Sequence, residues 1–180
     1  MKDFANIIIL IQSLLLPACS EIIEFSPYDT DINTHEINTL SAARITNEQQ
    51  STSDTLKFAL FSDVHENYDD LYDVTRSINN QLDLKFVISC GDITCSGLVQ
   101  EYKWYVKTVD DLRYPMITVI GNHDHLANGL EIFKKLFGCP NMAFTCGKYK
   151  FVTFNNTMWE NHNVSPEYEW LSNTLADSSF

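Results

Sequence analysis

Three apolar runs, each followed at once by polar residues of metal-binding type, constrain the fold of this chain more than any other feature. The runs are residues 56–61, 86–90 and 116–120, and each has the length of a strand. A helical stripe of apolar residues, spaced three and four apart, follows each run. The stripes are Leu71, Val74, Ile78 and Leu82, then Leu98, Tyr102, Val106 and Val109, then Leu130, Phe133 and Phe137. Wholly apolar strands that alternate with helices predict an α/β fold with a parallel βαβαβ sheet, covered by helices on both faces.

The pattern changes after Pro140, where shorter and more alternating segments begin. Residues 142–146 and 149–154 flank Gly147 and predict an antiparallel hairpin that follows the parallel sheet. A last helix is expected to begin at Ser165, with a proline in its first turn. Its predicted inward residues are Tyr168, Leu171 and Leu175.

The first 19 residues have the character of a signal peptide. Lys2 precedes an apolar core that is too short for a membrane span of about 20 residues but suits an export signal. The ending Leu16-Pro17-Ala18-Cys19 resembles the bacterial lipobox, in which the cysteine becomes the lipidated first residue. Ordinary secretion with cleavage near Ala18 is the alternative. We expect an exported protein, a bacterial cell-envelope lipoprotein held at the membrane by a lipid anchor on Cys19.

Composition changes again between this leader and the first apolar run. Residues 20–54 are rich in polar and acidic residues without sustained periodicity, so they are predicted to form a polar tether before a domain at 55–180. The net charge of −12 opposes nucleic-acid binding through a basic surface. It does not oppose a metalloenzyme, because bound cations would dominate the local charge.

Four cysteines follow Cys19, and an exported protein permits disulfides. The spacing of Cys139 and Cys146 leaves a disulfide between them open, although we favour buried free thiols for these two and for Cys90 and Cys95. No zinc-ribbon spacing is present in the sequence, which argues against a structural zinc site.

The polar residues after the three strands carry the chemistry. Asp63-Val64-His65 follows the first strand, Gly91-Asp92 the second, and Gly121-Asn122-His123-Asp124 the third. Ligands in parallel α/β sheets bind at the carboxyl ends of the strands, so these groups are expected to converge. Carboxylate, imidazole and amide oxygen donors suit divalent Mn, Fe, Zn or Mg.

These three blocks match the first three signature blocks of the calcineurin-like metallophosphoesterases, and the resemblance runs from about Leu56 to Leu175. The stretch from Gly91 to Glu101-Tyr102 looks most like the exported and cyclic-nucleotide phosphodiesterase branch. It lacks the Asp-Arg pair of the Ser/Thr protein phosphatases, because Cys95 and Ser96 stand there. The implied fold is the first half of a four-layer α/β/β/α metallophosphoesterase sandwich.

The resemblance also implies roles for individual residues and a reaction. The implied activity is hydrolysis of a small phosphomonoester or phosphodiester by a hydroxide that bridges two divalent metal ions. Asp63 and His65 would hold the first metal, Asp92 would bridge both, and Asn122 would bind the second. His123 would bind the phosphoryl or leaving-group oxygen and assist catalysis, Asn122 would also contact the substrate, and Asp124 would orient His123.

The family supplies further histidine ligands from a later strand and from a Gly-His-x-His block. None of the five histidines of this sequence forms that block, so we expect an incomplete metallophosphoesterase domain, truncated before those ligands. His125 and His162 are interpreted as solvated loop residues rather than metal ligands, although the loop of His162 is expected to overhang the site. The alternative to an enzyme is an inactive remnant or a weak metal- or nucleotide-binding module.

Overall fold

A computed structural model describes residues 26–47 and 55–177, so the predicted signal peptide and Cys19 lie outside the described residues. Three parallel strands form the sheet in the order β1-β2-β3. They are β1 (Ala59–Phe61), β2 (Val87–Ser89) and β3 (Met116–Thr118), and each is shorter than the apolar run that contains it. The register aligns Ala59 with Val87 and Val87 with Met116. The predicted parallel βαβαβ sheet is confirmed.

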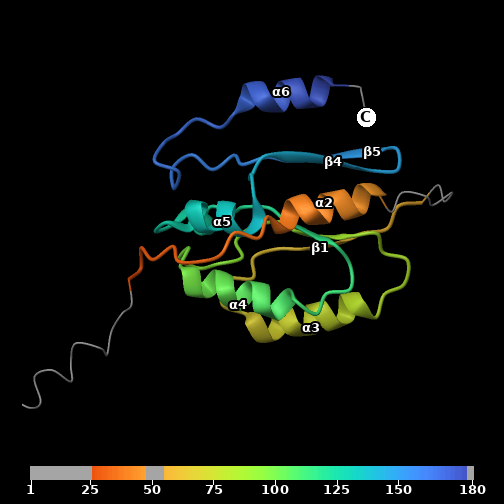
Figure 1. Cartoon of the computed structure of the whole chain (residues 1–180), viewed down its shortest axis with the longest axis horizontal. Helices are drawn as coiled ribbons and strands as arrows, with labels where there is room; N and C mark the ends of the chain where they lie inside the picture. Colours follow the sequence, from red (N-terminus) through yellow and green to blue (C-terminus); the bar gives the residue numbers. More distant parts are fainter. Residues whose placement is uncertain (1–25, 48–54, 178–180) are drawn as a thin grey trace, which may run out of the picture.

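Three helices connect and follow these strands: α3 (Tyr68–Asn79), α4 (Val99–Val109) and α5 (Gly129–Phe137). They bury one core against the sheet face that carries Val87 and Met116. The main buried side chains from the helices are Leu71, Ile78, Tyr102, Tyr105, Ile132, Phe133 and Phe137. Figure 1 shows α3 and α4 side by side on one side of the sheet.

The predicted stripe of the first helix is wrong in two places. Thr75 rather than Val74 turns inward, because positions 71, 75 and 78 share one face of α3. Leu82 is 75% exposed, since α3 has already ended at Asn79.

A hairpin, together with helix α2 (Ile37–Asn47), covers the other face of the sheet. Strands β4 (Met142–Cys146) and β5 (Tyr149–Thr153) pair antiparallel, as predicted, and Phe144 and Phe151 stack with ring centroids 5.2 Å apart. Phe86 meets both rings edge-on. The expectation that helices alone cover both faces is therefore wrong here, because the hairpin and one helix share the burial of this face. Helix α6 (Tyr168–Ala176) lies beyond the hairpin, so α6, the hairpin, the sheet and α3 with α4 succeed one another as α/β/β/α (Figure 1).

Helix α2 (Ile37–Asn47) lies within the segment that the sequence predicts as a polar tether, and that prediction is wrong for these residues. Ile45 is buried among Phe86, Ile117 and Phe144. The Asn38 side chain donates to the carbonyl oxygen of Thr118 over 2.7 Å and accepts from the Thr118 amide over 2.8 Å. The helix thus covers the outer edge of β3 and satisfies backbone groups that a bare edge would expose.

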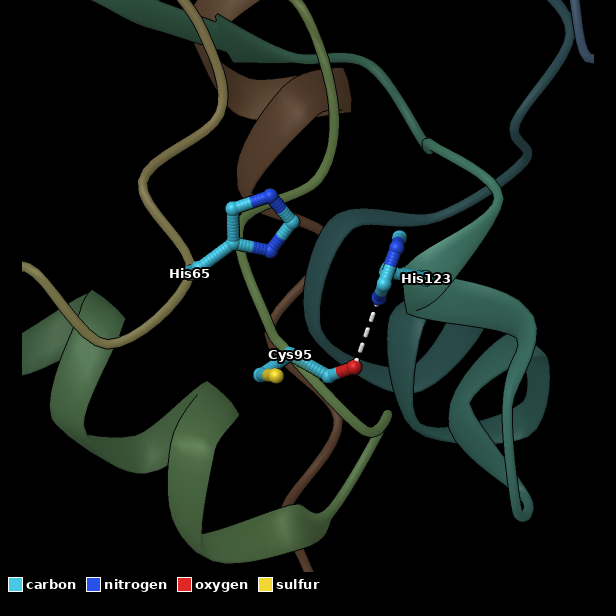
Figure 2. A group of neighbouring side chains, drawn as sticks. All are labelled: His65, Cys95 and His123. Atoms are coloured by element: carbon cyan, nitrogen blue, oxygen red, sulfur yellow. Dashed lines mark hydrogen bonds between the residues drawn. The ribbon is translucent and has the colours of Figure 1, made fainter.

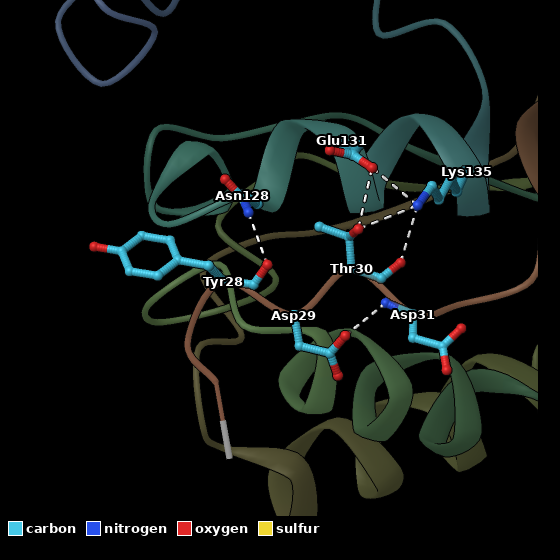
Figure 3. Close-up of polar contacts among 7 residues, drawn as sticks. All are labelled: Tyr28, Asp29, Thr30, Asp31, Asn128, Glu131 and Lys135. Atoms are coloured by element: carbon cyan, nitrogen blue, oxygen red, sulfur yellow. Dashed lines mark hydrogen bonds and ion pairs between the residues drawn. The ribbon is translucent and has the colours of Figure 1, made fainter. Parts of the chain in front are cut away.

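Residues 26–36, here called the N-terminal strap, are also docked rather than loose (Figure 3). The Thr30 hydroxyl donates to Glu131, and the Lys135 ammonium donates to the Thr30 carbonyl. The Asn128 amide donates to the carbonyl of Tyr28 over 2.8 Å. The strap therefore follows helix α5, which carries Glu131 and Lys135.

Helix α6 begins at Tyr168 rather than Ser165 and buries none of its residues within the described part of the chain. Tyr168 and Leu175, predicted to face inward, are 61% and 64% exposed. The helix rests on the hairpin side through Phe154, whose ring contacts those of Tyr168 and Trp170. Within residues 26–47 and 55–177, no helix has both the length and the apolar character to cross a membrane. The four cysteines in that part are free thiols, as favoured, but Cys90 and Cys139 are exposed rather than buried.

Candidate metal centre

Polar residues from the ends of all three strands meet at one end of the sheet. Donor atoms of Asp63, His65 and Asp92 lie within 4.8 Å of one another. Asn122 lines the same open cleft as Asp63 and Asp92, and the cleft has a volume of about 700 Å³. The structure thus gathers three of the four predicted metal ligands into one cluster and places the fourth in the adjoining wall.

The backbone at the three clustered residues is in the left-handed region. Their φ angles are 56° at Asp63, 47° at His65 and 50° at Asp92. Side-chain-bearing residues rarely adopt this conformation, which costs on the order of 1–3 kcal/mol each and gathers at functional sites. Two backbone hydrogen bonds between the loops hold it: the amide of Asp63 donates to the Gly91 carbonyl, and that of His65 to the Asp92 carbonyl.

Glycine is required where the second and third loops touch. A Cβ on Gly121 would lie 2.1 Å from Oδ1 of Asp92, and one on Gly91 would lie 2.9 Å from Cα of Gly121. The same Oδ1 of Asp92 accepts a hydrogen bond from the His123 amide over 3.0 Å. The absence of a side chain at Gly121 therefore lets the Asp92 carboxylate sit against the third loop.

Both predicted histidines are oriented by the loop after β2. Nδ1 of His65 lies 3.2 Å from the Thr94 carbonyl oxygen, and Nδ1 of His123 lies 2.7 Å from that of Cys95. A carbonyl only accepts, so each Nδ1 carries a proton, and in the neutral imidazole Nε2 then keeps its lone pair. This is the arrangement typical of metal-binding histidines, which donate their other nitrogen to a carbonyl or carboxylate. The rings approach edge to face, with centroids 4.8 Å apart (Figure 2).

Asp124 does not orient His123, contrary to the prediction. Its carboxylate is fully buried and accepts hydrogen bonds from the Thr94 amide and hydroxyl and from the amides of Gly121 and Ile93. Burial raises the pKa of this carboxyl above its ordinary value, and the hydrogen bonds from Gly121 and Thr94 act against that rise. Asp124 joins the second and third loops, and the loop of Thr94 that it holds also carries the Cys95 carbonyl next to Nδ1 of His123.

Glu160 belongs to the site although the sequence analysis did not propose it. Its Oε1 accepts a hydrogen bond from Nδ2 of Asn122 over 3.2 Å, and both residues line the cleft. Neighbouring Trp159 lines the cleft as well and is 79% exposed. The loop after the hairpin overhangs the cleft, as expected. That expected overhang is the sequence feature that could have pointed to Glu160. It brings Trp159 and Glu160 to the cleft.

The two remaining loop histidines differ from each other. His162 is exposed, as expected, and lines a separate small hollow beside His125. His125 is only 4% exposed, so its interpretation as a solvated residue is wrong. Its Nε2 lies 3.1 Å from Oδ1 of Asn155, and burial lowers its pKa. His125 therefore acts as a packed side chain under the loop.

The fold and the site together define an α/β protein with hard-metal donors at the carboxyl ends of its parallel strands. The chain belongs to the calcineurin-like phosphoesterase family, whose family model matches residues 56–178. Proteins of this family hydrolyse phosphoesters and generally use divalent metals, and the cluster of Asp63, His65 and Asp92 supplies candidate ligands for one.

A bacterial relative extends the comparison over a shorter stretch. A protein of Xenorhabdus bovienii (strain SS-2004), named as a probable cyclic nucleotide phosphodiesterase, is 30% identical over 60 residues. The match covers 33% of this chain and 24% of that protein, so the chain spans about a quarter of the relative's length.

Proposed function

We propose that this chain hydrolyses small phosphoesters with the help of two divalent metal ions held at the carboxyl ends of β1, β2 and β3. The observation that carries the proposal is the convergence of Asp63, His65 and Asp92 donors within 4.8 Å, in a chain of this family. The free Nε2 of His65 and the space left by Gly121 beside Asp92 fit the binding of such ions.

Each residue then has a defined task. Asp63 and His65 would hold the first ion, Asp92 would be shared by the two, and Asn122 would offer its amide oxygen to the second. Bound divalent ions supply Lewis-acid chemistry, since they neutralise phosphoryl charge and acidify water. His123 is anchored through Nδ1, so its Nε2 is available to hydrogen-bond a phosphoryl or leaving-group oxygen.

We further propose a phosphodiester, in preference to a phosphomonoester, as the substrate. The name of the Xenorhabdus relative supports this choice. The cleft of about 700 Å³ accommodates a ligand the size of one nucleotide, and exposed Trp159 offers an aromatic surface in its wall. The net charge of −12 opposes a long nucleic acid as substrate. Export and lipid anchoring at Cys19 remain part of the proposal on sequence grounds alone.

The test compares Mn²⁺ binding and turnover of bis(p-nitrophenyl) phosphate in the wild-type chain and in Asp92→Ala. We expect the wild type to bind Mn²⁺ and hydrolyse the diester, and Asp92→Ala to lose both while its circular dichroism spectrum is unchanged. Asp70→Ala, which removes an exposed carboxylate from α3, is the matched control and should retain both. Turnover by Asp92→Ala would overturn the shared-metal role.

A metal-binding module without turnover is the second candidate. It is favoured by the small number of ligands that we assign to the second ion, only Asp92 and Asn122 among the described residues. This candidate predicts Mn²⁺ binding that depends on Asp92, with no hydrolysis of the diester or of p-nitrophenyl phosphate by the wild type.

A further inference from the structure

The cleft of the metal centre is lined by two groups of residues with different chemistry. Asp63, Asp92 and Asn122 offer metal-binding groups, whereas residues 156–160, in the loop after β5, supply a continuous stretch of wall. Trp159 in this stretch is 79% exposed, more than any other large hydrophobic side chain of the described residues. An indole with that exposure cannot have both of its faces covered, so at least one face is open to a ligand in the cleft.

Hydrogen bonds hold the backbone that carries Trp159. The Thr157 amide donates to Oδ1 of Asn155 over 3.1 Å, and Thr157 itself is buried. The Met158 carbonyl accepts from the Asn163 amide over 2.8 Å, which closes the turn around Trp159. Because tryptophan has only two side-chain torsions, a ligand that orders this ring removes little conformational freedom.

The loop is also tied to the metal centre. Glu160, the residue after Trp159, accepts the hydrogen bond from Nδ2 of Asn122 over 3.2 Å. The position of the indole is therefore linked to that of the residue to which we assign the second ion. The cleft of about 700 Å³ has room for a ligand that places its phosphoryl group at Asp63 and Asp92 and another group against Trp159.

A flat, uncharged aromatic ring matches this part of the wall. Among the described residues that line the cleft there is no lysine or arginine, so no basic side chain is offered to a second phosphate. A base that stacks on an aromatic side chain gains about 5–150-fold in affinity, whereas glycerol or another acyclic alcohol has no π face to stack. Asn156, exposed in the same wall, carries an amide whose donors and acceptor can pair with the edge of such a ring.

We propose that Trp159 is a specificity-determining residue of this cleft, whose open indole face stacks on a planar aromatic group of the substrate, such as a purine base. The class of substrate is then a phosphoester that carries an aromatic ring, in preference to one built on glycerol or on a sugar alone. The inference rests on the proposed function, since the metal centre must hold the phosphoryl group while the ring lies on Trp159.

The test measures binding of adenosine 5′-monophosphate and of ribose 5-phosphate by isothermal titration of the Mn²⁺-loaded chain. The two ligands differ only by the base. We expect the wild type to bind the adenosine ligand about 5–150-fold more tightly. Trp159→Ala should bind both ligands equally, at the wild-type affinity for ribose 5-phosphate. Trp159→Phe keeps a flat ring and should retain part of the preference.

Trp104→Ala is the matched control, because it removes a half-exposed indole from α4 outside the cleft. It should keep the full preference for the adenosine ligand. Equal affinity of the wild type for both ligands, binding of neither by a chain that binds Mn²⁺, or a preference that survives in Trp159→Ala would overturn the proposal.

The titration measures no turnover, so its outcome is separate from that of the hydrolysis assay. A chain that prefers the adenosine ligand through Trp159 but leaves bis(p-nitrophenyl) phosphate intact would keep the stacking role and contradict the proposed hydrolysis. Hydrolysis of that diester by a chain without the preference would do the reverse.

Discussion

Nδ2 of Asn122 donates a hydrogen bond to Oε1 of Glu160 over 3.2 Å, which joins the loop after β3 to the loop after the hairpin. A carboxylate only accepts hydrogen bonds, so the amino side of the Asn122 amide is turned to Glu160. The amide oxygen is thereby left for a metal ion. Glu160 is in this sense a positioning residue for the ligand that we assign to the second ion.

Glu160→Ala should therefore weaken Mn²⁺ binding by about 10–100-fold, the usual effect of removing a partner of a metal ligand. Glu160→Gln keeps an acceptor oxygen at the same place and should weaken Mn²⁺ binding much less. Isothermal titration with Mn²⁺ measures both, with Glu169→Ala on exposed α6 as the control. If Glu160→Ala bound Mn²⁺ like the wild type, Glu160 would have no positioning role.

Gly121→Ala tests the contact between the second and third loops. The added Cβ would overlap both Oδ1 and the backbone nitrogen of Asp92, at 2.1 and 2.3 Å, and the backbone cannot yield as a flexible side chain could. We expect Mn²⁺ binding to be lost and unfolding free energy to fall by about 3 kcal/mol or more.

Gly147→Ala is the matched control for this change. Gly147 has φ +60° in the hairpin turn, and no atom lies within 4 Å of the Cβ that alanine would add. Gly147→Ala should lower the free energy of unfolding by about 1 kcal/mol, through backbone strain alone. Mn²⁺ binding should be retained. Urea denaturation and Mn²⁺ titration of the two variants separate a site effect from a turn effect.

The sequence predicts those features of the fold and site that repeat or alternate along the chain. The three strands and their polar ends are visible because each apolar run stops at a residue such as Asp63 or Asp92. The hairpin is visible because Gly147 separates two alternating segments. Since the ends of parallel strands share one edge, the convergence of the ligands follows from the strand order alone.

Features that depend on a single tertiary contact could not be predicted in this way. Helix α2 is anchored by its two buried residues, Asn38 and Ile45. The sequence of this helix has no sustained apolar period that would predict it. The left-handed backbone at His65 carries no sequence signal, since the residue is not glycine. Glu160 reaches Asn122 across 38 positions, and only the path of the intervening hairpin determines that distance.

Asn38→Ala should destabilise the fold although Asn38 lies far from the cleft in sequence. It would leave the Thr118 amide and carbonyl without their Asn38 partner at the edge of β3, and each unsatisfied group costs about 1–3 kcal/mol. We expect a loss of about 3 kcal/mol in urea denaturation. Leu40→Ala, an exposed change on the same helix, should alter stability by less than about 0.5 kcal/mol.

The docking of the N-terminal strap on α5 should weaken in acid. Hydrogen bonds from Lys135 and Thr30 lower the pKa of Glu131 below its ordinary value of 4.5. The folded chain favours the ionised form of Glu131. The contribution of this carboxylate to the docking of the strap is therefore present above pH 4.5 and is lost as the pH falls through the lowered pKa. Amide-exchange protection of residues 28–32 should decrease over that range in the wild type (Figure 3). Glu131→Gln should show no such change with pH, and an identical profile in both proteins would contradict the role of this carboxylate.

Asp124→Ala tests whether Asp124 joins the second and third loops or serves to orient the ring of His123. The change leaves buried donors on Thr94, Gly121 and Ile93 unsatisfied, so we expect a loss of about 3–5 kcal/mol in urea denaturation. Asp124→Asn keeps the volume but turns an amino group towards these donors, and it should lose about 2 kcal/mol. A residue that served only to orient the His123 ring would reduce turnover and leave stability unchanged. Equal stability of Asp124→Ala, Asp124→Asn and the wild type would therefore contradict the role of Asp124 in joining the two loops. The graded loss of stability would show that Asp124 maintains the loop whose carbonyls accept from both histidines.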